Sequence, residues 1–313
     1  MKRDLITVTD LTDDELQNVF QRAQGFERMS AQERLSLRGK LVGKHCLLLF
    51  YEPSTRTRLS FEVAAKTFGM DVCVATAESS SVAKGESIED TAQTCGALGF
   101  DLAVMRHPDD GAVAEFAEHF PAPVINGGSG KSAHPTQALL DAYALWKRDL
   151  LREGLRIAIC GDILHSRVAR SNVRLLNRFG ITPMLVAPKE LMPDGFTLEA
   201  GTSDTESLQA ETQHNLDDIL GEVDAIMMLR TQTERHGGVV LIRPKDFIAG
   251  YQLNAQRLEK LRADAVIMHP GPVVRGSEMT DDVMQDERTI IVEQVAGGVF
   301  VRMALVDLLV QQT

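Results

Sequence analysis

The 313-residue sequence lacks several features that would identify common classes of protein. Its four cysteines lie far apart, and it contains neither a CxxC pair nor a Cys/His cluster, which argues against a zinc site and a disulfide framework. No window approaches the ~20 apolar residues that a membrane-spanning helix requires. The start of the chain also lacks the apolar segment of a secretory signal. These absences predict a cytoplasmic protein that binds no metal and no membrane.

Two nucleotide-binding signatures are incomplete, and no cofactor is indicated. Gly161 follows a predicted strand, but no GxGxxG sequence accompanies it, which argues against a dinucleotide site. Gly130-Lys131-Ser132 resembles the end of a phosphate-binding P-loop, but Ile125 stands where that motif requires glycine. The formal net charge of -11 argues against non-specific nucleic-acid binding. Any anion site must therefore be a local basic pocket on an acidic protein.

The strongest positive signal is the segment Glu52-Pro53-Ser54-Thr55-Arg56-Thr57-Arg58. An apolar run over 46–50 predicts a buried strand before it, and residues 59–69 predict a helix that ends at a glycine. A helix N-terminus offers free N–H groups and a positive dipole end, to which the hydroxyls and guanidiniums add donors. The segment therefore predicts a site for a phosphate-sized anion. Taken alone, it is equally consistent with an N-cap followed by two solvated arginines.

Strands and helices alternate along the chain, which predicts two α/β domains. Each is expected to hold a mostly parallel sheet with helices on both faces, and the active-site cleft is expected between them. The first domain is predicted over residues 1–148 and the second over 149–292, with the C-terminal helix over 293–313 packing back on the first. Residues 126–132 and 236–250 lack periodicity and are predicted to be loops, whereas 215–220 are predicted to be helical.

Six polar residues follow predicted strands directly or lie in the next loop or helix start. Ligands of parallel sheets bind beyond the carboxyl ends of the strands, so these distant residues are expected to converge on one site. The set has several arginines and two histidines, but no nucleophile paired with a base and no carboxylate cluster. It therefore favours binding of anions and catalysis by positioning and charge stabilisation. The residues are Ser54, Arg106, His134, Arg167, Arg230 and His269.

Considered together, these segments resemble the aspartate and ornithine carbamoyltransferase family over essentially the whole chain. The matching segments are Ser54-Thr55-Arg56-Thr57-Arg58, Ser80 with Lys84, Arg106, His134-Pro135-Thr136-Gln137, Arg230-Thr231-Gln232 and His269-Pro270-Gly271-Pro272. The last two resemble the members that use aspartate. The resemblance implies transfer of the carbamoyl group of carbamoyl phosphate to the α-amine of L-aspartate. The products would be N-carbamoyl-L-aspartate, used in pyrimidine biosynthesis, and phosphate.

The resemblance also implies a role for each matched residue. The contacts to carbamoyl phosphate would be Ser54, Thr55, Arg56, Thr57, Ser80, Lys84, Arg106, His134, Gln137, Pro270 and Gly271. The catalytic members of this set would be Arg56, Thr57, Arg106 and His134, which stabilise charge on the leaving phosphate or on the carbonyl oxygen. The contacts to aspartate would be Lys84, Arg167, Arg230 and Gln232. Ser80 is chosen over Ser79 and Ser81 by spacing alone.

The family supplies the residues matching Ser80 and Lys84 from a neighbouring subunit, which implies a homotrimer with shared active sites. A regulatory chain or a dihydroorotase partner stays open. Two other functions fit the sequence less well. An ornithine carbamoyltransferase would share the carbamoyl phosphate half, but its His-Cys-Leu-Pro and Ser-Met-Gly segments are absent, and a cationic substrate fits poorly beside Arg167 and Arg230. A non-catalytic homologue is disfavoured because every matched catalytic position is intact.

Overall fold

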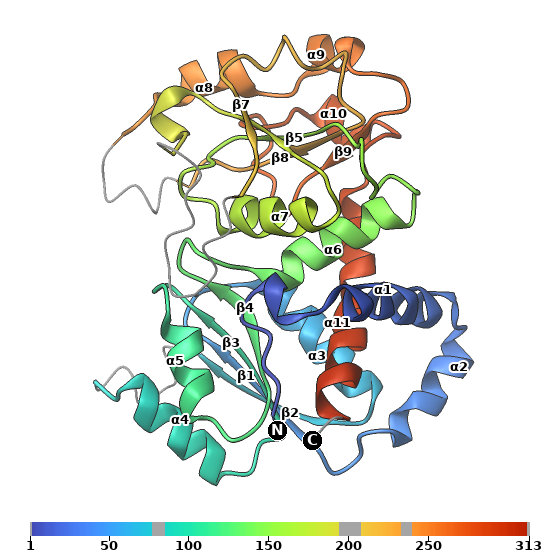
Figure 1. Cartoon of the computed structure of the whole chain (residues 1–313), viewed down its shortest axis with the longest axis vertical. Coiled ribbons are helices and arrows are strands. Elements are labelled where there is room, and N and C mark those ends of the chain that lie inside the picture. Colours follow the sequence, from blue (N-terminus) through green and yellow to red (C-terminus); the bar gives the residue numbers. More distant parts are fainter. Residues whose placement is uncertain (1, 77–84, 194–207, 233–239, 312–313) are drawn as a thin grey trace. The chain divides into compact units, whose positions relative to one another are not determined.

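The computed structural model of the chain describes residues 2–76, 85–193, 208–232 and 240–311. The chain divides into two compact units, one formed by Met1–Tyr143 with Val295–Thr313 and the other by Ala144–Gln294. Each unit contains a parallel sheet with helices on both faces (Figure 1), so the prediction of two α/β domains is confirmed. Among the helices described, none is long and apolar enough to span a membrane.

The sheet of the first unit has the strand order β2-β1-β3-β4, and every neighbouring pair is parallel. The carboxyl ends of all four strands therefore lie at one edge. The central strands β1 and β3 are almost entirely buried, as their apolar sequences predict, whereas the edge strand β2 is largely exposed. The strands are β1 (His45–Phe50), β2 (Asp71–Thr76), β3 (Leu102–His107) and β4 (Val124–Ser129).

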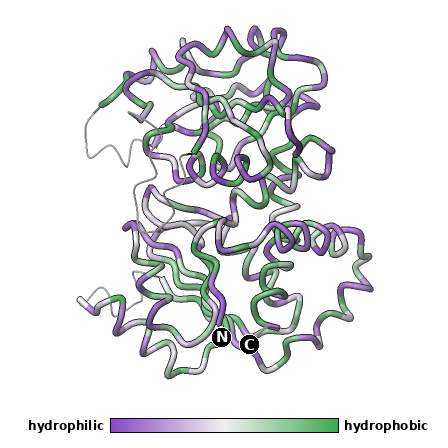
Figure 2. The backbone as a smooth tube through the Cα atoms, in the orientation of Figure 1, coloured by the Kyte–Doolittle hydropathy of each residue, from purple (hydrophilic) through white to green (hydrophobic). Residues whose placement is uncertain are grey.

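Helices cover both faces of this sheet. Figure 1 shows α4 and α5 on one side and α3 and α11 on the other. The predicted capping box of Thr12 and Glu15 opens α1. In Figure 2, α1 carries hydrophilic and hydrophobic residues along its length, whereas α11 is mostly hydrophobic. The helices are α1 (Asp13–Arg28), α2 (Ala31–Ser36), α3 (Thr55–Thr67), α4 (Ile88–Ala97), α5 (Ala112–His119), α6 (Pro135–Trp146) and α11 (Ile291–Val310).

The sheet of the second unit has the strand order β7-β6-β5-β8-β9, again with every pair parallel. Figure 1 shows α7 on one face, with α8 and α9 on the other. The strands are β5 (Ile157–Cys160), β6 (Met184–Val186), β7 (Glu211–Gln213), β8 (Ala225–Met228) and β9 (Val266–Met268). The helices are α7 (Arg167–Arg178), α8 (Pro244–Tyr251), α9 (Ala255–Lys260) and α10 (Asp281–Gln285).

The glycine-rich segment after residue 125 differs from the predicted loop, because β4 continues to Ser129. A Cβ at Gly127 would lie 3.2 Å from the carbonyl oxygen of Met105 on the neighbouring strand. Glycine therefore permits close approach of β4 to β3 at a point where the register also shifts. The sequence suggested a loop because glycine weakens the strand signal.

Two predictions in the second unit were wrong. Residues 215–220 form turns and not a helix, and the Asp217 side chain is bonded there to Arg257 and Lys260. Residues 244–250, predicted to be loop, belong to α8. Its signals were present in the sequence: a proline at the first helical position and the buried pair Phe247 and Tyr251.

Candidate active site

The segment predicted to bind an anion lies where the sequence places it, between the end of β1 and the start of α3. Ser54 precedes the helix in an extended conformation, and its side chain makes no capping hydrogen bond within the described part of the chain. Thr55 and Arg56 are exposed, while Thr57 is 4% exposed. The hydroxyl of Ser60 donates to the carbonyls of Arg56 at 2.7 Å and Thr57 at 3.0 Å, which fixes the first turn. The hydroxyl of Ser54 is therefore not used to cap its own helix.

Arg106 lies at the end of β3, opposite Phe50 of β1. Its Nη1 donates to the Gly127 carbonyl at 3.1 Å, and its Nε lies 3.3 Å from Glu52 Oε2. The carboxylate and the carbonyl therefore orient the guanidinium between β1 and β4. Glu52 belongs to the predicted anion-binding segment, but the sequence did not indicate this role for it. The sequence feature that could have suggested this role is an acidic residue that closely follows a predicted strand and precedes two arginines.

His134 and Gln137 lie at the start of α6. His134 is 4% exposed, and its carbonyl accepts the N–H of Gln137 at 3.0 Å. The Nε2 of Gln137 donates to Asp141 Oδ1 at 2.9 Å. Asp110 Oδ1 accepts the N–H groups of residues 131 and 132, both at 2.9 Å, which holds the turn before the helix. The first unit thus brings the start of α3, the end of β3 and the start of α6 to the same edge of its sheet.

The predicted residues Ser80 and Lys84, with Ser79 and Ser81, lie outside the described residues. In the ranges that are described, no group of three or more His, Cys, Asp or Glu side chains is placed to hold a metal ion.

In the second unit, Asp162 connects the segments that carry the predicted aspartate contacts. It follows β5 and is fully buried. Its Oδ1 lies 2.9 Å from His165 Nδ1, and its Oδ2 accepts the Gln232 N–H at 3.0 Å. Arg167 opens α7 and is 4% exposed, while Arg230 and Gln232 follow β8. Asp162 therefore ties the β5–α7 loop to the segment after β8. The sequence showed an acidic residue at a strand end here, but nothing indicated its partners.

His269 follows β9, and both of its ring nitrogens bond to residues of the loop that comes after it. It is 2% exposed, and its Nδ1 accepts the Gly271 N–H at 2.8 Å. The Nε2 therefore carries the proton and donates to Glu278 Oε1 at 3.1 Å. The same oxygen accepts the Val274 N–H at 2.7 Å. Burial raises the pKa of Glu278, but the bonds from His269 and the backbone outweigh it and lower that pKa overall.

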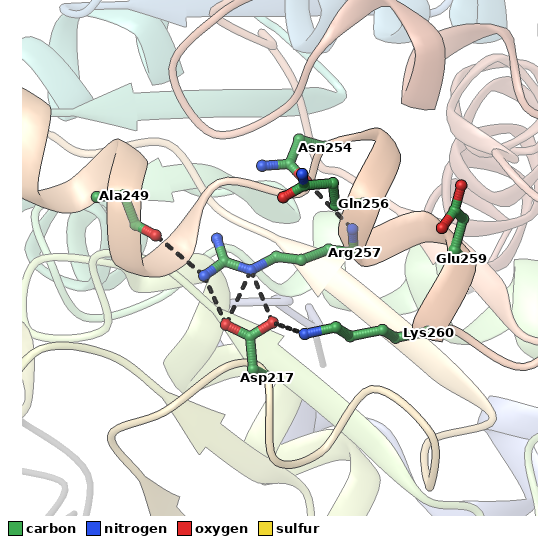
Figure 3. Close-up of a pocket in the computed structure, with 7 residues that line it drawn as sticks. All are labelled: Asp217, Ala249, Asn254, Gln256, Arg257, Glu259 and Lys260. Carbon is green, nitrogen blue, oxygen red and sulfur yellow. Dashed lines mark hydrogen bonds and ion pairs between the residues drawn. The ribbon is translucent and has the colours of Figure 1, made fainter.

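A pocket of about 540 Å³ opens in the second unit, and none of the predicted site residues lines it (Figure 3). Arg257 Nη2 donates to Asp217 Oδ2 at 2.8 Å and to the Ala249 carbonyl at 3.0 Å. Lys260 donates to the other carboxylate oxygen at 2.8 Å. The hydrogen bonds from Arg257 and Lys260 lower the pKa of Asp217 to about 2. The two cations thus serve a structural cross-link between α8, α9 and the turn at 217.

Two family models match the chain. One is described as the carbamoyl-P binding domain of aspartate/ornithine carbamoyltransferase and matches residues 3–147, and the other as the Asp/Orn binding domain and matches residues 153–309. The chain is 42% identical, over 316 aligned residues, to the aspartate carbamoyltransferase catalytic subunit of a Nocardioides species, which covers 99% of this chain and 94% of that relative.

Solved structures of aspartate and ornithine carbamoyltransferases are also similar to this chain. The chain is similar to aspartate transcarbamoylase from Trypanosoma cruzi in complex with carbamoyl phosphate, with a TM-score of 0.85, 30% identity and coverage of 97% of this chain and 96% of that one. It is also similar to ornithine carbamoyltransferase from Pyrococcus furiosus, with a TM-score of 0.84, 26% identity and coverage of 100% and 98%.

Proposed function

Because the chain belongs to the aspartate and ornithine carbamoyltransferase family, we propose that it transfers the carbamoyl group of carbamoyl phosphate to L-aspartate. The observation that carries the choice of aspartate is the 42% identity, over 99% of this chain, to an aspartate carbamoyltransferase catalytic subunit. Arg167, Arg230 and Gln232 support it, because two guanidiniums and an amide suit a dicarboxylate. A cationic second substrate such as ornithine would be repelled by the same arginines.

The first unit supplies the carbamoyl phosphate contacts in this proposal. Ser54, Thr55 and Arg56 bind the phosphate, because hydroxyls, a guanidinium and a helix start all donate to oxyanions. Thr57, Arg106 and His134 donate to the carbonyl oxygen, and Gln137 contacts the carbamoyl amine. Glu52 and the Gly127 carbonyl hold Arg106 before substrate binds, which favours stabilisation of charge that develops later.

The reaction then needs no dedicated base from the protein. The α-amine of aspartate attacks the carbamoyl carbon, and negative charge grows on the carbonyl oxygen, where Arg106 and His134 donate. The C–O bond to phosphate breaks, and Arg56 stabilises the negative charge that the leaving phosphate gains. The departing phosphate accepts the proton that the amine loses. The backbone carbonyls of Pro270 and Gly271 accept from the carbamoyl amine.

The second unit supplies the aspartate contacts Arg167, Arg230 and Gln232, and residues 1–148 and 149–292 are proposed as the two substrate-binding domains. Asp162 accepts from the backbone of Gln232 and so positions that segment. Catalysis depends on such positioning, because a bound amine and a bound carbonyl react far faster than the same groups free in solution.

We also propose a homotrimer in which Ser80 and Lys84 act in the site of a neighbouring chain. Leu59 and Val63 on α3 are 45% and 51% exposed, and Val74 on β2 is 40% exposed. These apolar side chains lie on elements that adjoin each other, and β2 leads directly into the segment with Ser80 and Lys84. An exposed apolar surface next to that segment suits an interface between copies. A regulatory chain or dihydroorotase partner stays open, and a cytoplasmic location stays a prediction.

The activity is tested by supplying the purified protein with carbamoyl phosphate and either aspartate or ornithine. Formation of N-carbamoyl-L-aspartate and phosphate in equal amounts is expected, with no citrulline. Turnover of ornithine without turnover of aspartate would refute the assignment, and no turnover of either would favour a non-catalytic homologue.

Shared sites are tested by mixing two inactive variants, Arg56→Ala and Lys84→Ala. If each site takes Arg56 from one chain and Lys84 from the next, random 1:1 trimers regain about a quarter of the intact sites. Each variant is also dissociated and reassociated alone as a control. Mixed trimers, verified by mass, that stay inactive would contradict the shared site.

A further inference from the structure

Two buried charges lie behind the start of α6, and neither belongs to the predicted contacts with the substrates. Asp141 is 0% exposed and lies one turn after Gln137 on the same helix. Arg302 of α11 is 3% exposed. Burial lowers the pKa of Arg302 to about 10, and attraction to Asp141 opposes that shift. Arg302 therefore stays charged at neutral pH and offsets part of the cost of burying the carboxylate.

The surroundings of Arg302 hold it between the two helices that begin at the candidate active site. Its guanidinium carbon lies 5.2 Å from the ring centroid of Phe61 on α3, a cation–π arrangement. Its Nη2 lies 3.5 Å from the Thr136 hydroxyl on α6. A Cβ at Gly298 would lie 3.0 Å from its Nη1, so glycine leaves room for the guanidinium. Arg302 is thus a fixed positive charge inside the first unit.

The bond from Gln137 to Asp141 determines which way the Gln137 amide faces. An ionised carboxylate only accepts hydrogen bonds, so Gln137 must present its Nε2 to Asp141, as the 2.9 Å contact shows. Its carbonyl oxygen, Oε1, then points away from Asp141. No hydrogen bond to that oxygen is found in the described ranges of the chain. The –NH₂ of a carbamoyl group is a donor and requires an acceptor of this kind.

We propose that Asp141, with its charge offset by Arg302, positions the Gln137 amide so that its oxygen accepts from the carbamoyl amine. This inference rests on the proposed function and adds the source of selectivity for the donor. Asp141 touches no substrate and acts as a positioning residue through Gln137. The arrangement favours carbamoyl phosphate over acetyl phosphate, in which a methyl group replaces the amine and donates no hydrogen bond.

The experiment compares the dissociation constants of carbamoyl phosphate and acetyl phosphate by calorimetric titration of the full chain. Asp141→Ala is expected to raise the dissociation constant of carbamoyl phosphate about 10-fold, which corresponds to roughly one hydrogen bond. The dissociation constant of acetyl phosphate should rise less than about twofold. The double variant Gln137→Ala/Asp141→Ala should show the same ratio of the two constants as Gln137→Ala alone, because Asp141 acts only through Gln137.

Tyr143→Phe is the matched control on the same helix. It removes the 2.6 Å hydrogen bond from Tyr143 to Glu27 and is expected to lower Tm without changing the selectivity ratio. Asp141→Ala/Arg302→Met removes both buried charges together, and it should show the same loss of selectivity if the single variant does not fold.

The inference would be overturned if the ratio of the two dissociation constants stayed at the wild-type value in Asp141→Ala or in Asp141→Ala/Arg302→Met. So would a further loss of selectivity when Asp141→Ala is added to Gln137→Ala. A wild-type protein that binds carbamoyl phosphate but turns over no aspartate would refute the proposed function and leave the selectivity comparison to decide the role of Asp141.

Discussion

Replacing Glu278 offers a sharp test of how the loop with Pro270 and Gly271 is held. The Glu278 carboxylate is fully buried and accepts from His269 Nε2 at 3.1 Å and from the Val274 N–H at 2.7 Å. Each hydrogen bond to a buried charged acceptor contributes about 1.5–3 kcal/mol. Glu278→Ala leaves both donors without an acceptor, so a loss of about 3–5 kcal/mol in unfolding free energy is expected.

Glu278→Gln is the matched control, because both donors share the single atom Oε1. A glutamine oxygen can accept from both donors, so the cost comes from the lost charge and from the amide –NH₂ placed at the position of Oε2, which is buried and has no hydrogen-bond partner among the described residues. A smaller cost than for Glu278→Ala, about 1–2 kcal/mol, is expected. Urea unfolding followed by circular dichroism measures both costs. Steady-state kinetics should also show a higher KM for carbamoyl phosphate in Glu278→Ala than in Glu278→Gln, because Pro270 and Gly271 lose their support.

The pH dependence separates the charge from the shape of Glu278. Its pKa is lowered in the folded protein from the ordinary value of 4.5. The stabilisation is therefore fully present above that ordinary value and is lost as pH falls through the lower folded pKa. The wild-type protein should lose its stability advantage over Glu278→Gln in that acidic range. An advantage that is the same at pH 3 and pH 7, or equal costs for the two variants, would refute the reasoning.

Three further predictions concern single side chains. Arg56→Ala should lower kcat by about 100-fold or more, because it removes a charge-assisted contact used in the transition state; near-normal kinetics would contradict the phosphate role. Asp162→Ala should raise the KM for aspartate about 10-fold or more by freeing the Gln232 segment, with the dissociation constant of carbamoyl phosphate nearly unchanged; equal changes in both would argue against this role. Asp217→Asn should lower the urea midpoint at pH 7, and the deficit should vanish as pH falls from about 4 through the folded pKa of about 2; a deficit independent of pH would contradict the link to Arg257.

Secondary structure was predicted best where the sequence pattern is local. The apolar run before Glu52 forms β1, and the capping box of Thr12 and Glu15 lies at the start of α1, both as predicted. Capping and burial periodicity involve residues three or four positions apart, so neighbouring residues alone specify them. The helix predicted over 215–220 is absent, and the Asp217 carboxylate there bonds to side chains more than thirty positions away, which a local pattern does not reveal.

The sequence by itself determined the residue types at the ends of the strands. Parallel topology follows from alternating strands and helices, and it gathers strand ends at one edge. The sequence alone therefore predicts that Ser54, Arg106 and His134 lie near each other. The motifs also sufficed to predict the family.

Only the tertiary structure identified the acidic residues that hold these groups in position. Glu52 orients Arg106, Asp162 holds the Gln232 segment, Asp141 faces the Gln137 amide and Glu278 supports the loop after His269. Asp141, Asp162 and Glu278 are buried, and a buried carboxylate is stable only with donors around it. Glu52 and Asp162 bond to residues more than fifty positions away, which no local pattern reveals. The sequence therefore predicts which groups contact the substrates, and the packing decides which way those groups face.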